Sequence, residues 1–168
     1  FDLREALTFR SIDDAYELLP QGVRLQNNDS DVAISGTVDS DLFDTENPCN
    51  LKTTSTLSNV VYLYSGHDLE VDDLADVFDP DLVSPVTVPP ANAIKPFASA
   101  TVTVADAGGD GQYVFCFLPA GDYTLAFSCN AVTDDPENFD SISIPLPSDQ
   151  LSEETVNSGN QLIVPFPK

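Results

Sequence analysis

The sequence predicts an all-β protein, an antiparallel β-sandwich of Greek-key type with an N-terminal extension strand. Two observations support this expectation. Short segments alternate apolar and polar side chains with the period of two that marks half-buried strands. Turns that contain proline and glycine separate these segments, and short strands at such spacing are typical of sandwiches.

The N-terminal segment is predicted to be a strand over residues 1–10, because apolar and polar side chains alternate there. The residues on its apolar face are Phe1, Leu3, Leu7 and Phe9. A second strand is expected within residues 16–26. The polar run 27–31 then separates an extension, residues 1–30, from a sandwich domain, residues 31–168.

The first half of the sandwich contains two predicted strands, residues 32–38 and the apolar run 60–64. Residues 39–56 between them form an acidic, turn-rich loop. Residues 70–77 are expected to form a short helix, because apolar residues recur there at the spacing of one helical face. The proline-rich residues 80–96 are predicted to be an irregular connection.

The second half is predicted to contribute a strand over residues 97–105 and a hairpin over residues 111–129. The hairpin alternates aromatic and β-branched residues on both sides of a turn with proline and glycine. Its second strand turns one set of side chains inward: Tyr123, Leu125, Phe127 and Cys129. Residues 139–146 and 160–166 are expected to be the last two strands, with prolines near their ends.

The charge of the chain restricts its partners. Six basic residues stand against 28 acidic ones, which gives a formal net charge of -22. This sign disfavours nucleic acid and anionic membrane surfaces, whose binders need basic patches. It favours solubility, cations or a basic partner.

No apolar stretch reaches the roughly 20 residues of a membrane helix, so we expect no membrane insertion by this chain. The chain starts at Phe1 and contains no methionine. We interpret it as a mature exported chain, secreted or at the cell surface.

Three cysteines allow one disulfide and one remaining thiol. We expect a Cys49–Cys129 disulfide between an early loop and the hairpin, which leaves Cys116 as a buried thiol. A Cys116–Cys129 bridge across the hairpin and three reduced cysteines are the alternatives.

The hairpin resembles a pattern of transthyretin-like, or carboxypeptidase-regulatory-like, β-sandwich domains. The residues that carry the resemblance are Gly111, Tyr113, Phe115, Leu118, Gly121 and Tyr123. The sequence ISGTV at 34–38 is similar to the opening strand of the same family, so the resemblance covers about residues 32–166. It implies a prealbumin-like fold and a mostly accessory role. It also requires a β-bulge near Cys116 and Phe117, because Phe115 and Leu118 must both point inward.

The N-terminal segment is similar to part of bacterial surface lipoproteins that carry such a domain in their C-terminal part. The resemblance implies that residues 1–10 end an upstream β-domain. In this chain the strand then either folds back on its own sheet or completes the sheet of another copy.

Acidic turns are candidates for Ca²⁺, the one cofactor the sequence suggests. Asp106 and Asp110 flank a glycine-rich turn that offers several oxygens, the ligands Ca²⁺ prefers. Further acidic clusters lie at residues 39–46 and 134–140, and none has the EF-hand spacing. Turns without any metal are the alternative interpretation.

No familiar catalytic motif is present, and the single histidine, His67, is interpreted as a surface residue of a turn. We therefore expect a non-catalytic extracellular or cell-surface structural module. It is expected to build filaments by β-strand addition through residues 1–10, with itself as the partner. The alternative is an accessory domain of a larger surface lipoprotein that binds Ca²⁺ or glycans.

Overall fold

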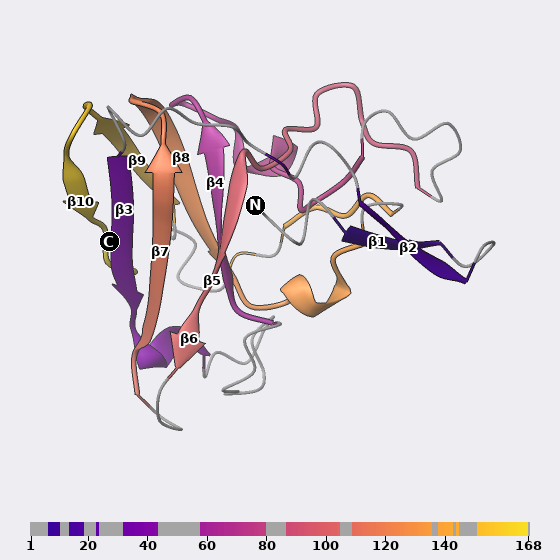
Figure 1. The fold of residues 1–168 in the computed structure, drawn as a ribbon, viewed down its shortest axis with the longest axis horizontal. Helices are drawn as coiled ribbons and strands as arrows, with labels where there is room; N and C mark the ends of the chain where they lie inside the picture. The colour runs from indigo at the N-terminus through magenta and orange to yellow at the C-terminus, as the bar shows by residue number, and fades with distance from the viewer. Residues whose placement is uncertain are drawn as a thin grey trace.

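Two four-stranded β-sheets pack face to face in the computed structural model, as the sequence predicts (Figure 1). The structure describes residues 7–10, 14–18, 23, 32–43, 58–79, 87–104, 109–135, 138–142, 144 and 151–167. Within these ranges no helix is long and apolar enough to cross a membrane.

The first sheet, here called the outer sheet, has the strand order β10–β3–β7–β6. Its strands are β10 (Gln161–Ile163), β3 (Val32–Val38), β7 (Gly111–Leu118) and β6 (Thr103–Val104). Neighbouring strands run antiparallel except β10, which lies parallel to β3. Strand β3 has the bounds that the sequence predicts.

The second sheet, here called the central sheet, has the order β5–β4–β8–β9 and is antiparallel throughout. Its strands are β5 (Ala98–Thr101), β4 (Val60–Ser65), β8 (Gly121–Ser128) and β9 (Leu151–Val156). The predicted strand 97–105 divides between the two sheets as β5 and β6. At the crossing, the Val102 amide donates a hydrogen bond to the Asn59 carbonyl at 2.8 Å.

Aromatic and aliphatic side chains fill the space between the two sheets. The largest buried contributions come from Ile34, Leu63, Leu118, Leu125, Phe127 and Phe166, each at most 1% exposed. Tyr113, Phe115 and Tyr123 are 4% exposed each, so the inward aromatics of residues 111–129 form the core. The hairpin expected there is wrong, because β7 pairs with β3 and β6 in the outer sheet whereas β8 pairs with β4 and β9 in the central sheet. The turn between β7 and β8 therefore carries the chain from one sheet to the other.

A third layer, here called the loop layer, covers the other face of the central sheet. It consists of residues 69–79, 87–97 and the described part of 131–144, and it includes the 3₁₀ turns η4 (Val71–Asp73) and η5 (Ala131–Thr133). A second apolar cluster lies beneath it, built on Tyr62 and Tyr64 of β4. Strand β4 is therefore buried on both faces, which explains its uninterrupted apolar run.

The bulge that the family resemblance requires is present in β7. Ile34 pairs with Phe115 but Val32 pairs with Leu118, so β7 has one extra residue. Phe117 takes up that residue with a φ of 59° and is 57% exposed. Phe115 and Leu118 both point into the core as a result.

Several sequence-based expectations are wrong in and beside the loop layer. The predicted helix at 70–77 is reduced to η4, because Leu74 and Ala75 pair with Ile94 and Ser141 instead of continuing a helix. The expected strand 139–146 has a single isolated β-bridge in its described part, from Ser141 to Ala75. Strand β9 was not predicted.

The N-terminal region forms a separate two-stranded sheet of β1 (Leu7–Arg10) and β2 (Ala15–Leu18), here called the β1–β2 hairpin. Leu7 pairs with Leu18 and Phe9 with Tyr16. The strand expected within 16–26 is thus wrong in extent, since β2 ends at Leu18 and Val23 lies outside any strand. The proposed boundary at 30/31 lies outside the described residues.

Gly36 in β3 is required by a close approach of the chain. A Cβ atom built there would lie 1.8 Å from the carbonyl oxygen of Val164 and 2.8 Å from the Tyr113 ring. The Val164 backbone is fixed in place because its amide donates to the Ser35 carbonyl at 2.8 Å.

We expect Gly36→Ala to lower the free energy of unfolding by about 2–3 kcal/mol, because backbone and core must shift to admit a methyl group. Urea denaturation measures this loss. Gly121→Ala is the control, since its Cβ would meet only the Tyr123 ring at 3.9 Å. Equal urea midpoints for Gly36→Ala and the unmodified chain would show that β10 is not held this closely.

Candidate functional site

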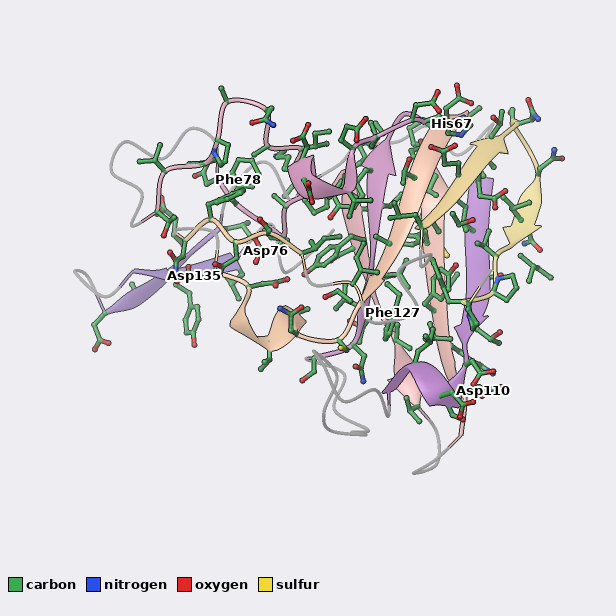
Figure 2. All side chains as sticks on the ribbon, turned by 180° about the vertical axis from the view of Figure 1, so that it is seen from behind. His67, Asp76, Phe78, Asp110, Phe127 and Asp135 are labelled. Carbon is green, nitrogen blue, oxygen red and sulfur yellow. The ribbon has the colours of Figure 1, made fainter. Side chains whose placement is uncertain are left out.

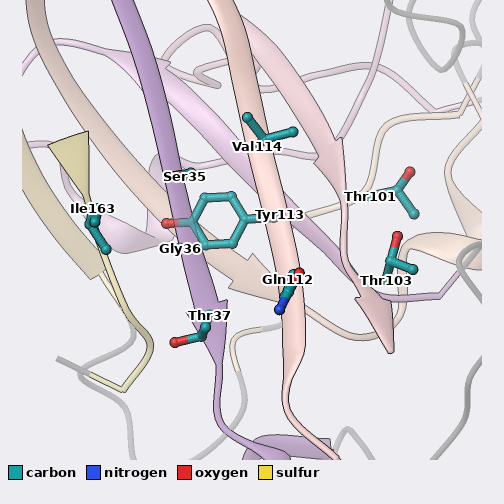
Figure 3. Close-up of a pocket in the computed structure, with 9 residues that line it drawn as sticks. All are labelled: Ser35, Gly36, Thr37, Thr101, Thr103, Gln112, Tyr113, Val114 and Ile163. Atoms are coloured by element: carbon teal, nitrogen blue, oxygen red, sulfur yellow. The ribbon is translucent and has the colours of Figure 1, made fainter. Parts of the chain in front are cut away.

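The outer face of the outer sheet carries an open groove of about 520 Å³ (Figure 3). It crosses all four strands and also reaches the end of β5. The nine lining residues are Ser35, Gly36, Thr37, Thr101, Thr103, Gln112, Tyr113, Val114 and Ile163. None of these nine is charged, so the groove offers hydroxyl, amide and aliphatic groups only.

The alternation of β3 and β7 explains this lining. Val32, Ile34 and Val38 point into the core, which leaves Ser35 and Thr37 on the outer face. Likewise Tyr113 and Phe115 point inward, and Gln112 and Val114 point outward. Cys116 continues this outward row and is exposed.

The floor of the groove is held by Tyr113. Its ring lies against Gly36, and its hydroxyl donates a buried hydrogen bond to the Val164 carbonyl at 2.7 Å. Burial, and secondarily the charge of Glu154, raises the pKa of Tyr113. The phenol therefore stays protonated and serves as a donor that ties β7 to the segment after β10.

A second polar site lies in the loop layer, where the carboxyl groups of Asp76 and Asp134 hydrogen-bond to each other. Asp76 is only 4% exposed. The Tyr62 hydroxyl donates to Asp134 Oδ2, and the Asp140 amide donates to Asp76 Oδ1 at 3.3 Å. Figure 2 places Asp76 in the loop layer near Phe78.

The carboxyl pair of Asp76 and Asp134 retains a proton at pH values where an ordinary carboxyl group is ionised. Burial, followed by the charge of Asp134, raises the pKa of Asp76 to about 8. Burial and the same two carboxylates also raise the pKa of Tyr64, whose hydroxyl donates to the Ala75 carbonyl at 2.6 Å. At neutral pH the pair therefore shares a proton and fastens the loop layer to β4.

The predicted interface strand is only partly covered by the structure. Phe1 and Leu3 lie outside the described residues. Leu7 is 41% exposed, and Phe9 belongs to β1 by its backbone. Tyr16 and Leu18 of β2, which the sequence does not single out, are 72% and 55% exposed.

Only one of the two predicted Ca²⁺ ligands lies in the described part of the chain, so their site stays a prediction. Asp106 lies outside that part, and Asp110 Oδ1 accepts a hydrogen bond from the Ser40 amide at 3.0 Å. Asp39 Oδ1 accepts from the Asp41 amide at 2.9 Å. Among the described residues no group of three or more acidic, cysteine or histidine side chains could hold a metal ion.

The cysteines differ in state. Cys129 is disulfide-bonded, whereas Cys116 is a free thiol, so the Cys116–Cys129 bridge and the fully reduced form are both wrong. Cys116 is also exposed rather than buried, because it follows Gln112 and Val114 in the outward-facing row of β7. Cys49 lies outside the described residues, and its pairing with Cys129 stays a prediction.

His67 lies in the bend after β4, as expected for a turn residue, but it is half-buried. Its Nε2 atom is enclosed without a hydrogen-bond partner. The neighbouring Asp68 amide donates to Glu153 Oε1 at 2.5 Å. Figure 2 shows His67 at one end of the sandwich and Asp110 at the other, so the two do not form one site.

The carboxyl pair was missed by sequence reasoning, although one signal exists. Asp76 interrupts the apolar run of Leu74, Ala75, Val77 and Phe78, and an acid in such a run is a candidate for burial.

No family model, curated protein or solved structure matches this chain. Functional proposals therefore rest on the geometry of its own residues.

We expect stability to fall as pH rises toward 8. The folded protein keeps a proton on Asp76 up to about pH 8, whereas the ordinary value is 3.8, so unfolding releases a proton between these limits. The contribution of Asp76 is complete below about pH 4 and lost above about pH 8, with a slope of at most about 1.4 kcal/mol per pH unit.

Urea denaturation between pH 6 and 9 measures this slope. Asp76→Asn keeps a neutral donor beside Asp134 and should flatten the profile and stabilise the protein at pH 9. Asp72→Asn, at an exposed position of the same segment, removes the same charge and should leave the slope unchanged. Parallel profiles for Asp76→Asn and the unmodified chain would contradict the shared proton.

Proposed function

We propose that this chain is a non-catalytic structural module of the extracellular space or cell surface. Copies of it associate through the β1–β2 hairpin. The observation that carries the proposal is the position of this hairpin, whose strands pair with each other and belong to neither sheet of the sandwich (Figure 1).

The hairpin has an apolar surface that a partner would cover. Leu7 and Leu18 lie opposite each other in the pairing register and are 41% and 55% exposed. Tyr16 adds an aromatic ring that is 72% exposed. A two-stranded hairpin is marginally stable alone in water, so docking against another surface would stabilise it.

The charge distribution supports a second copy as the partner. Three of the six basic residues, Arg4, Arg10 and Arg24, fall within the first 24 residues, against five acidic residues there. The remaining 144 residues hold the other three basic residues and 23 acidic ones. The first 24 residues are thus the part of the chain that a second, acidic copy of the protein repels least.

An extracellular location is supported by the chemistry of the chain. A disulfide at Cys129 suits an oxidising compartment, and a net charge of -22 suits high salt. The bulge in β7 supports the resemblance of this chain to transthyretin-like sandwich domains, many of which are accessory modules. A structural role on this fold requires no catalytic group.

We expect the unmodified chain to form multimers in 0.5 M salt, where repulsion between acidic copies is screened. Leu18→Lys should shift it to monomers, because a lysine cannot be buried in the contact without losing hydration. Light scattering and negative-stain microscopy measure the change.

Val88→Lys is the control, since it places the same group at a 76% exposed position outside the hairpin. Choosing lysine avoids adding negative charge, so loss of assembly could not be assigned to stronger repulsion. A strict monomer for the unmodified chain at several hundred micromolar would end the proposal.

A further inference from the structure

We propose that the β1–β2 hairpin of one copy docks on the outer face of the outer sheet of the next copy, over the groove. This inference rests on the proposed function and names the surface that receives the hairpin. Three observations point to that surface: its exposure, its lack of charge and its position relative to the hairpin.

Among the described residues, the outer face is the sheet face that no other layer covers. The central sheet is covered on one side by the outer sheet and on the other by the loop layer. On the outer face, Val114 is 56% exposed and Ile163 is 77% exposed. Phe117, at the bulge of the same strand as Val114, is 57% exposed. Exposed aliphatic and aromatic groups on one sheet face mark a surface for association.

This face also lacks charge. The outward-facing residues of its four strands are Ala33, Ser35, Thr37, Thr103, Gln112, Val114, Cys116, Gln161 and Ile163. None of them is acidic, in a chain with 28 acidic residues. Two copies of such a chain repel each other least where one of them presents this uncharged face. The first 24 residues of the chain, which include the hairpin, hold half of its basic residues.

The contact has to join different copies. Both views place the hairpin on the loop-layer side of the central sheet, with the outer sheet on the opposite side (Figures 1 and 2). Within one chain the donor and the receiving face therefore point away from each other. A donor on one side and an acceptor on the other make a heterologous contact, which continues from copy to copy.

The first test uses Val114→Lys and Ile163→Lys, on two strands of the receiving face. Both side chains are exposed, so the variants should fold with unchanged melting temperature. We expect each to weaken association at least tenfold, like Leu18→Lys, while Val88→Lys does not. If the chain associates and Leu18→Lys blocks it but neither face variant does, the hairpin proposal stands and the receiving face is wrong.

Mixing the variants gives a sharper result. Leu18→Lys keeps an intact face, and Val114→Lys keeps an intact hairpin, so together they should form one-to-one pairs that grow no further. The double variant should form no pair with itself. Homodimers of Leu18→Lys would overturn the docking scheme, because they would mean that two outer faces contact each other. The absence of pairs in the mixture would also overturn it, because an intact hairpin and an intact face would then fail to bind.

Cys116 supplies a native probe of the same face, as a free and exposed thiol two residues from Val114. A short bis-maleimide reagent should link Cys116 of one copy to a Tyr16→Cys position on another, giving a covalent dimer by mass spectrometry. A Cys116→Ser version is the control that should lose the link. Links found only within single chains would place the hairpin on its own sandwich and refute the inference.

Discussion

The burial of the central sheet on both faces is the constraint on which the rest of this structure depends. Strand β4 sends Val61 and Leu63 into the core between the sheets and sends Tyr62 and Tyr64 beneath the loop layer. Its five apolar residues are each at most 1% exposed. Removing either cover would expose one side of this strand, so the outer sheet and the loop layer are both needed. Polar groups under the loop layer must then find partners inside the protein, which explains why the buried Asp76 is paired with Asp134.

The regular parts of the fold could be predicted because their periodicity is local. Val32–Val38 alternates, and β7 and β8 are marked by aromatics on both sides of a turn. The sequence indicates these two strands but not that they join different sheets instead of pairing with each other. The bulge at Phe117 was predicted from two residues that must both point inward. These features depend on which face of a strand is buried, and a sequence displays that directly.

The loop layer could not be predicted, because long-range contacts decide its structure. Leu74 and Ala75 have helical spacing with their neighbours, but their backbone groups pair with Ile94 and Ser141. Strand β9 could not be predicted, because Glu153 and Glu154 lie in its middle and the strand shows no clear apolar alternation. It lies at the edge of the central sheet. The carboxyl pair joins residues 58 positions apart, Asp76 and Asp134, and no local pattern indicates such a meeting. The groove is likewise defined by four strands from distant parts of the chain.

The crossings of the chain between the two sheets have a mechanical consequence. Along one side, β5 and β6 are nearly continuous, so a single stretch of backbone serves both sheets at residues 98–104. Along the other side, the short turn at 157–160 carries the chain from β9 to β10. Neither sheet can slide over the other without straining one of these covalent links. A pulling force applied to either sheet is therefore shared by both, and the sandwich would move as one stiff block while bending is left to the segments outside it.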